Sequence, residues 1–328
     1  MVGSLRRLLA AIAILIPPLL AQAQYPERPI KLILPFPAGS ATDGAARYIA
    51  QDVGKALGQP LVVENHAGAD GIIAAQLAKR AAPDGYTLFV STNSAHGSNP
   101  ALYSNLPYDP VADFVPVAGL IRIPITLVVR KDLPADDVAG FVKLARQRPS
   151  SKSLSYGSGN TSNRVAAELF KATAKIDMVN VQYRGTPQAL NDLLGGQIDV
   201  MFVDPYSAMG FINARQVKVL AVLDTVRHPL LPDVPTMSEA GYKDTQVVTW
   251  AAAFAPAKTS QDIVDRLNLA FNKSLAKAQT RTALSRMAMT PMMMSERTSR
   301  IRCLRAKSLA KTCRTGQHPK KVMRDKDE

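Results

Sequence analysis

The stretch ILPFPAGSATDGAARYIA, residues 33–50, decides the fold. An apolar strand runs into a small-residue loop through Gly39 and Ser40, and a helix opens near Asp43. We predict Asp43 as the N-cap of this helix, because its short side chain can accept a hydrogen bond from the first turn. Such a junction points free backbone N–H groups and the positive end of a helix dipole at one place. It therefore predicts an anion-binding site at the carboxyl end of the strand.

The first 23 residues have the pattern of a secretory signal peptide. Arg6 and Arg7 form a charged start, residues 8–16 an apolar core, and AQA at 21–23 a small-residue cleavage site. A membrane anchor would need about 20 uninterrupted apolar residues, and the double proline at 17–18 interrupts this run. We therefore expect cleavage after Ala23, export, and a soluble mature protein that is periplasmic in a cell with two membranes.

The formal net charge of +14 is unevenly distributed along the 328 residues. The tail, residues 295–328, carries +7 and the leader +2, which leaves +5 for the body. That is an ordinary surface charge, so no nucleic-acid partner is expected. Both cysteines, Cys303 and Cys313, lie in the tail, and the four histidines lack metal-ligand spacing. We expect no metal site and no cofactor.

Short β-rich runs alternate with longer helical runs along the body. The first series has predicted strands at 31–36, 61–64 and 87–91 and helices at 44–57 and 71–80. This order predicts a parallel sheet that is covered by helices on both faces. The second series has strands at 125–129, 153–156, 179–182, 199–203 and 218–222 and helices at 138–147, 163–172 and 187–194.

Two successive α/β sheets predict two lobes with a cleft between them. A last strand at 247–254 and a helix at 261–278 complete the first lobe if the chain crosses back. Lobe 1 is then expected to comprise residues 24–122 and 225–294, and lobe 2 residues 123–224. The two crossings, near 122–125 and near 223–225, would form a hinge.

Three polar loops should face the cleft, because open α/β sheets bind ligands beyond the carboxyl ends of their strands. They are Pro37–Asp43, Ser91–Ser94 and Gly157–Ser162. The first and third precede helices in different lobes, so two helix N-termini would face each other, each suited to a carboxylate. Singly, each loop is ordinary capping or turn chemistry. Three loops at equivalent strand ends favour a binding site.

Enzymatic alternatives find less support in the sequence. The G-x-G at 157–159 lacks the third glycine and the downstream acidic residue of a dinucleotide-binding loop. No G-x-S-x-G nucleophile elbow occurs. A secreted α/β hydrolase with a cleft serine would need a histidine near Ser40 or Ser94, for which His66 and His96 are the candidates. Its signature would be turnover of an ester or a phosphate.

Ordered blocks over nearly the whole body resemble one family. They are PFPAGSATD (35–43), LGQPLVVEN (57–65), APDGYTL (82–88), NPALY (99–103), LPYDPVADFVPV (106–117), YGSGNTSNRVAAELF (156–170), YRGTPQALNDLLGGQIDVMFVD (183–204), LPDVPTMSEAG (231–241) and WAAAFAP (250–256). Together they resemble the periplasmic substrate-binding receptors of tripartite tricarboxylate transporters, the Bug receptors. The resemblance implies a two-lobed type II periplasmic-binding-protein fold, no catalysis, and delivery of a small carboxylate to membrane permease subunits.

In that family, loop amides, hydroxyls and bridging waters hold the ligand carboxylate, so the resemblance implies a set of ligand-binding residues. They are Phe36, Ala38, Gly39, Ser40, Thr42, Asp43, Ser91, Thr92, Asn93, Gly159, Asn160, Thr161, Ser162 and Asp204. Ala38 and Ser40 depart from the family's more frequent Pro-Pro-Gly-Gly, which leaves the ligand geometry at Ser40 open.

Three charged residues have two interpretations each. Asp204 either acts on the ligand, by accepting a hydrogen bond from an amine, hydroxyl or water or by rejecting a second carboxylate through its charge, or is a turn residue before Pro205. Arg164 and Arg184 are the nearest cations for a distal carboxylate. Arg164 is expected to solvate its helix, and Arg184 either reaches the cleft from the end of its strand or lies on the lobe surface.

The resemblance stops at Ser295. Family members continue with an acidic helix containing a Lys-Trp pair, whereas residues 295–328 are basic and lack tryptophan. We interpret this atypical tail as the product of a frame change or recombination, or as a disordered extension. We expect a monomer. The sequence leaves open whether the ligand is a di- or tricarboxylate, an amino acid or an aromatic acid, and whether the receptor serves transport or a membrane sensor kinase.

Overall fold

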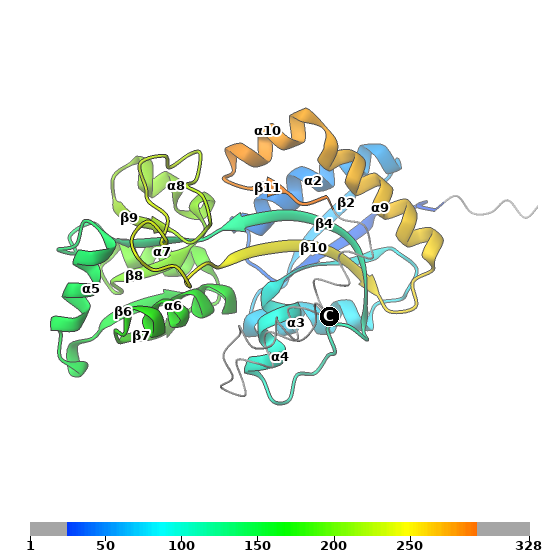
Figure 1. Ribbon diagram of the computed structural model, residues 1–328. Coiled ribbons are helices and arrows are strands. Elements are labelled where there is room, and N and C mark those ends of the chain that lie inside the picture. Colours follow the sequence, from blue (N-terminus) through cyan, green and yellow to red (C-terminus); the bar gives the residue numbers. More distant parts are fainter. Residues whose placement is uncertain (1–24, 294–328) are drawn as a thin grey trace, which may run out of the picture.

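The computed structural model describes residues 25–293 as two α/β lobes, each built on its own sheet (Figure 1). The signal-peptide prediction and the tail prediction fall on residues 1–24 and 294–328, outside the described residues. The first sheet has the strand order β11-β4-β10-β3-β1-β2, and the second has the order β7-β6-β8-β5-β9.

The elements of the first lobe come from both ends of the described chain. Its strands are β1 (Ile30–Leu34), β2 (Leu61–Asn65), β3 (Thr87–Thr92), β4 (Phe114–Pro124), β10 (Val248–Pro256) and β11 (Thr290–Pro291). Its helices are α2 (Ala41–Leu57), α3 (Ile72–Arg80), α4 (Asn99–Leu102), α9 (Gln261–Ala276) and α10 (Ala278–Arg286), with short turns η1 (Ala69–Gly71) and η2 (Ser94–Ser98).

The second lobe is formed by the middle of the chain. Its strands are β5 (Thr126–Arg130), β6 (Leu154–Ser158), β7 (Met178–Gln182), β8 (Val200–Val203) and β9 (Val217–Val222). Its helices are α5 (Val138–Gln147), α6 (Thr161–Ala174), α7 (Thr186–Leu194) and α8 (Pro205–Asn213), with the turn η3 (Ser150–Lys152).

Both sheets are buried on both faces, as an α/β fold requires. Alternate residues of a strand point to opposite faces, so on β1 Leu32 and Leu34 pack toward α2 and α9, whereas Ile33 packs toward α3. In the second sheet Leu127 of β5 packs toward α5 and α6, and Val128 packs toward α7. The helices therefore sandwich each sheet (Figure 1).

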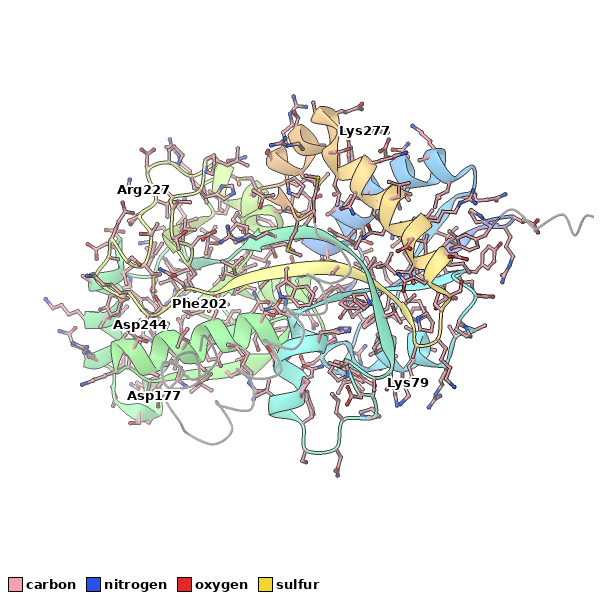
Figure 2. All side chains as sticks on the ribbon, turned by 45° about the vertical axis from the view of Figure 1, so that its right-hand side comes forward. Lys79, Asp177, Phe202, Arg227, Asp244 and Lys277 are labelled. Carbon is pink, nitrogen blue, oxygen red and sulfur yellow. The ribbon has the colours of Figure 1, made fainter. Side chains whose placement is uncertain are left out.

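Charged side chains lie on the outside of this sandwich (Figure 2). The labelled Arg227 and Lys277 are about half exposed and pair with Glu239 and Asp52. Phe202 on β8 is fully buried. The exposed ion pairs contribute little stability individually, so the apolar cores hold the lobes together.

The predicted parallel sheets are mixed sheets. The β-α-β units do pair in parallel: β1 with β2 and β3, and β6 with β7 and β8. β10 is antiparallel to β3 and β4, and β5 is antiparallel to β8 and β9. β10 and β5 both follow a crossing between lobes, where the chain enters the next sheet without a crossover helix, and the short β11 adds a further antiparallel pair with β4.

The chain passes between the lobes at two adjacent places. β4 ends at Pro124 in the first sheet and β5 begins at Thr126 in the second. The return lies at 247–248, not at 223–225. Residues 224–247 stay on the second lobe, because Met237 is buried in its core and the segment bonds to β9.

Two elements near the cleft were not predicted. Strand β4 was not predicted, because its first residues fall in the family block at 106–117 and its last residues were assigned to the crossing near 122–125. Helix α8 was missed because Asp204-Pro205 is a strong turn signal, yet proline is also favoured in the first turn of a helix. β4 and β10 run side by side toward the second lobe (Figure 1).

Candidate functional site

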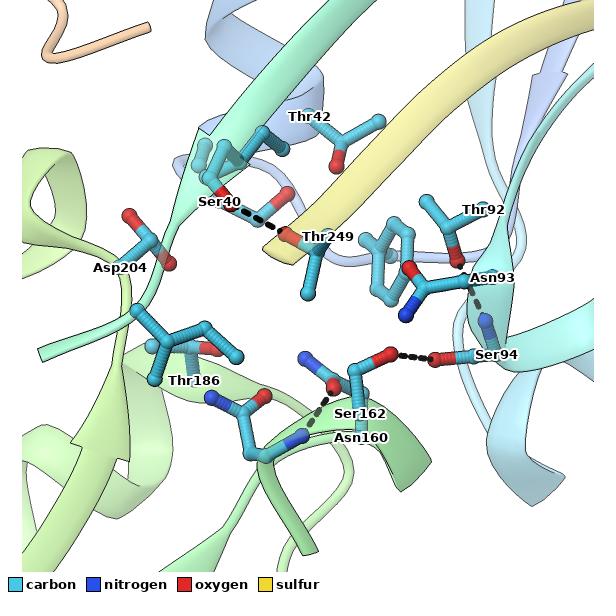
Figure 3. Close-up of a pocket in the computed structure, with 15 residues that line it drawn as sticks. Ser40, Thr42, Thr92, Asn93, Ser94, Asn160, Ser162, Thr186, Asp204 and Thr249 are labelled. Carbon is cyan, nitrogen blue, oxygen red and sulfur yellow. Dashed lines mark hydrogen bonds between the residues drawn. The ribbon is translucent and has the colours of Figure 1, made fainter. Parts of the chain in front are cut away.

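A small cavity of about 40 Å³ lies between the lobes. Both lobes line it, with Phe36, Ser40, Ala41, Thr42, Thr92, Asn93, Ser94, Ile123 and Thr249 from the first and Ile125, Asn160, Ser162, Asn163, Thr186 and Asp204 from the second (Figure 3). Asp204 is the one charged residue among them. The cavity is therefore lined by hydroxyl and amide groups and a few apolar side chains.

Four helices begin at this cavity. Ser40 caps α2, Asn160 caps α6, Asp204 caps α8, and α7 starts at Thr186. Each helix N-terminus carries unpaired N–H groups and a partial positive charge. Their convergence makes a positive potential without any cationic side chain in the lining, which suits a carboxylate.

The first loop places Phe36, Ser40 and Thr42 at the cavity. Ser40, not Asp43, is the N-cap of α2: its Oγ accepts from the Asp43 N–H at 3.3 Å. The prediction of Asp43 as the cap was wrong because α2 begins three residues before the predicted start. The hydroxyl at Ser40 therefore has a local structural role beside its place in the lining.

Asp43 does not line the cavity, but its carboxylate stabilises the loop through hydrogen bonds outside the cavity. Its carboxylate accepts hydrogen bonds from the Gly39 N–H at 3.1 Å, the Arg47 guanidinium at 3.0 Å and the Asn65 amide at 2.9 Å. Burial opposes its ionisation, but these bonds outweigh burial and hold the pKa of Asp43 below its usual value. Ala38 and Gly39 are also absent from the lining, and Gly39 has the left-handed φ of 80° that favours glycine.

The second loop places Thr92, Asn93 and Ser94 at the cavity, but not Ser91. Ser91 is fully buried and its Oγ lies 2.7 Å from the Nδ1 of His96. His96 stacks on Phe254 with ring centroids 3.9 Å apart, and burial lowers the pKa of His96 to about 3. This serine–histidine pair faces the core of the first lobe.

The third loop places Asn160 and Ser162 at the cavity and keeps Gly159 and Thr161 beside it. A Cβ on Gly159 would lie 2.4 Å from the Thr186 backbone nitrogen, so only glycine lets the α6 and α7 N-termini approach this closely. The Thr161 Oγ1 is turned toward the first lobe, where it donates to Asn99 Oδ1 at 3.2 Å.

Asp204 faces the cavity as a half-buried carboxylate. Its oxygens accept from the Ser207 N–H at 2.8 Å and the Ser207 hydroxyl at 3.1 Å, so it is the N-cap of α8. Burial raises the pKa of Asp204, and the Ser207 bonds offset this only in part. Asp204 therefore fits both interpretations of the sequence, because it caps α8 and also lies in the cavity wall.

Several lining residues were not in the predicted set. Ser94 belonged to a predicted loop but not to the predicted site, and Ala41 and Asn163 adjoin predicted site residues. Thr186 was hidden because α7 was predicted to begin at Pro187, and Ile123, Ile125 and Thr249 lie on the strands beside the crossings. A pairing of β4 with β10 would have placed Ile123 opposite Thr249.

The lobes touch directly around the cavity. Ser94 Oγ lies 2.9 Å from Ser162 Oγ (Figure 3). The Thr161 hydroxyl bonds to Asn99, so a second hydrogen bond joins the lobes here. At the hinge side, Arg122 on β4 pairs with Asp224 at 2.7 Å. These contacts bring the second and third predicted loops together.

Neither a metal site nor a membrane-spanning helix finds support among residues 25–293. Within that range no group of three or more His, Cys, Asp or Glu could hold a metal ion. No helix in the same range is long and apolar enough to cross a bilayer.

Two α/β lobes, two adjacent crossings and an interlobe cavity whose polar lining is neutral except for Asp204 define a periplasmic-binding-protein type of solute receptor. The model of the tripartite tricarboxylate transporter family receptors, TctC, matches residues 45–312. The chain belongs to this family. The match extends to residue 312, beyond the predicted end of the resemblance at Ser295.

Individual relatives agree with this assignment. A Pseudomonas sp. (strain P51) protein encoded in the tcbD-tcbE intergenic region is 36% identical over 86% of this chain and 85% of its own length. Protein BugT of Bordetella pertussis is 32% identical over 81% of this chain and 82% of its own length.

Solved structures show the same fold. An R. palustris protein solved with adipate superimposes with a TM-score of 0.84 at 31% identity, covering 87% of this chain and 95% of that one. MatC from Rhodopseudomonas palustris with bound malate superimposes with a TM-score of 0.81 at 33% identity, covering 87% of this chain and 98% of that one. Periplasmic binding protein BugD gives 0.82 at 28% identity, covering 87% and 96%. The predicted family and the two-lobed α/β fold are confirmed.

Proposed function

We propose that this chain is an extracytoplasmic solute-binding receptor that captures a small organic carboxylate and delivers it to the permease subunits of a tripartite tricarboxylate-type transporter. The observation that carries the proposal is the convergence of four helix N-termini on a cavity without a cationic side chain in its lining. The adipate and malate complexes of its relatives support the ligand class.

Ligand capture would work by hinge closure. A carboxylate docks on the N-termini of one lobe, and the other lobe then completes its hydrogen bonds. Contacts such as that of Ser94 with Ser162 can form only when the lobes touch, so they favour the closed form once the ligand is bound. The permease would recognise this closed shape.

The residues that would touch the ligand are those that line the cavity and offer polar groups. From the predicted set these are Ser40, Thr42, Thr92, Asn93, Asn160, Ser162 and Asp204, with Phe36 as an apolar wall. Ala38, Gly39, Asp43, Ser91, Gly159 and Thr161 would instead fix the shape of the loops. Ser94 and Thr186 join the contacting set.

The moving bodies would be residues 25–124 with 248–293 and residues 125–247. The hinge would lie where the two crossings run side by side. We propose that the receptor is a monomer that binds without catalysis. A periplasmic location is supported by its family of transporter receptors and by a similar structure described as a periplasmic transporter.

The hydrolase alternative rests on a serine beside a histidine, and Ser91 with His96 is such a pair. Both side chains are fully buried and neither lines the cavity. We assign the pair a packing role. Incubation with ester and phosphate substrates is expected to give no turnover above buffer, and turnover that Ser91→Ala abolishes would restore the enzyme interpretation.

Titration calorimetry tests the receptor proposal with C4 to C6 carboxylates, amino acids and aromatic acids. At least one acid is expected to bind. The double substitution Ser40→Ala with Ser162→Ala should lower the affinity for that acid by about tenfold or more, since each change removes a charge-assisted hydrogen bond. Ser151→Ala, on the exposed surface of the second lobe, is the matched control. A folded protein that binds no acid of the panel contradicts the proposal.

A further inference from the structure

A second interlobe pocket of about 270 Å³ adjoins the cavity. The two share Phe36 and Asn160, so these residues form the partition between them. The pocket is closed by residues 68–71 and Tyr103 on the first lobe and by residues 182–184 on the second. Unlike the cavity, it contains a cation.

That cation is Arg184, which follows β7 and directly precedes the start of α7. It is solvent-exposed and lines the pocket. No ion pair within 4.0 Å joins it to a carboxylate among the described residues. Arg164, the other candidate, lines neither the pocket nor the cavity.

The opposite wall of the pocket is a fixed loop. Ala69 and Asp70 adopt left-handed φ angles of 46° and 52° between Gly68 and Gly71, which is strained for residues with a Cβ. The Tyr103 hydroxyl donates to Asp70 at 2.5 Å, and Gln182 reaches the same carboxylate across the cleft at 3.4 Å. Asp70 therefore adds a carboxylate to this wall of the pocket, but its bonds come from neutral donors and it forms no ion pair with Arg184 within 4.0 Å.

We propose that this pocket is a subsite for the second acid group of a dianionic ligand, held by Arg184 while the first carboxylate lies at the helix N-termini. The proposal rests on the proposed receptor function. A guanidinium presents two parallel N–H donors that match a carboxylate. The ligand chain would pass the partition between Phe36 and Asn160, and the apolar walls at Pro35 and Tyr103 suit an aliphatic or aromatic spacer.

The test compares each dicarboxylate from C4 to C8 with the monocarboxylate of the same length by calorimetry. In the wild-type protein the second carboxylate is expected to improve the affinity for at least one length by about 10- to 100-fold, the range of a charged hydrogen bond. Arg184→Gln should remove this advantage and leave the monocarboxylate affinity unchanged. Arg184→Lys, which keeps the charge but not the fork, should retain part of it.

Arg215→Gln is the matched control, because Arg215 is an exposed arginine of the same lobe that lines neither pocket. It should keep the full advantage. An advantage that survives Arg184→Gln, or that is absent from the wild-type protein while monocarboxylates bind, overturns the subsite and leaves the receptor function intact. A wild-type protein that binds no acid at all overturns the receptor function itself.

Discussion

The ring of Pro37 in the first lobe lies directly on Gly185 in the second. A Cβ added at Gly185 would come within 2.5 Å of Pro37 Cγ, so the glycine is the recess into which the proline fits. The opposite arrangement occurs at Gly44 of α2, where a Cβ would lie 2.8 Å from the hydroxyl of Tyr206 on α8. Each lobe thus inserts one ring over a glycine of the other.

Gly185→Ala should block closure without harming the fold. Its φ of −178° is extended backbone that alanine adopts freely, so the unliganded melting temperature should change little. Overpacking costs about 1–3 kcal/mol, and the ligand affinity should fall by about 5- to 150-fold. Calorimetry with the best acid of the panel measures this.

The double variant Pro37→Ala with Gly185→Ala provides the control. Removing the ring restores the space, so the affinity should recover most of the loss. An affinity for Gly185→Ala equal to wild type would mean that Pro37 and Gly185 separate in the ligand-bound form.

Gly44→Ala should raise stability and lower affinity at once. Alanine is preferred over glycine inside a helix by about 1 kcal/mol, so α2 should gain stability. The added methyl pushes Tyr206 away from the first lobe, which weakens ligand binding. Thermal unfolding and calorimetry on the same sample separate the two effects, and Gly210→Ala, a glycine of α8 with open space around it, is the control.

Thr161→Val should weaken ligand binding through a bond between the lobes. It keeps the shape of the side chain but removes the donor to Asn99. Since Thr161 is not in the cavity lining, a loss of about 2- to 10-fold would report on closure rather than on ligand contact. The small-angle scattering radius with ligand should then lie nearer the unliganded value; an unchanged affinity argues against the bond.

Asp204→Asn should stabilise the protein at neutral pH. Burial raises the pKa of Asp204, so between the unfolded and the folded pKa the native state binds the extra proton, and stability falls as the pH rises through that window. Asparagine removes this loss and still caps α8. Measured from pH 4 to pH 8, the melting temperature of the variant should therefore change less with pH above the unfolded pKa than that of the wild-type protein.

The same variant distinguishes two ligand classes. For an acid without an amine, Asp204→Asn removes a repulsive charge and affinity should rise. For an amino acid, it removes the acceptor of the ammonium group and affinity should fall. An unchanged affinity for both classes would place Asp204 outside ligand contact.

His96→Phe should reduce the sensitivity of the fold to acid. Burial lowers the pKa of His96 to about 3 from 6.5, so the unfolded chain binds more protons between these values and stability is lost as the pH falls from 6.5 toward 3. Phenylalanine can stack on Phe254 without titrating. Calorimetric unfolding should show a smaller slope in this window, and the slope that remains below pH 4 should come from carboxylates such as Asp43.

The sequence predicted the local elements better than their pairing. Strands and helices with clear periodicity, such as α5 at Val138–Gln147, were predicted with the correct ends. β4 and the second crossing could not be predicted, because they depend on which distant strand lies next to β10. The loop around Ser40 was recognisable because strand, glycine and helix are consecutive in the chain.

Whether a loop residue lines the cavity or stabilises the loop depends on the direction of its side chain, which the local sequence does not encode. Asp43 and Ser40 are three residues apart, yet one bonds behind the loop and the other lines the cavity. Ser91 and Ser94 differ in the same way, because Ser91 meets His96 in the core. The position of Arg184 at a pocket became visible only with residues 68–71 across from it.

The adjacent crossings have a consequence for the chain as a whole. Residues 125–247 form one uninterrupted segment whose two ends lie on either side of Leu223, since the Val247 N–H bonds to Leu223 and the Leu223 N–H bonds to Ile125. This segment has its own cores on both faces of its sheet. The second lobe is thus an insertion that could be excised, expressed alone, or exchanged between relatives as a cassette, whereas the first lobe can be assembled only from two separate pieces of chain.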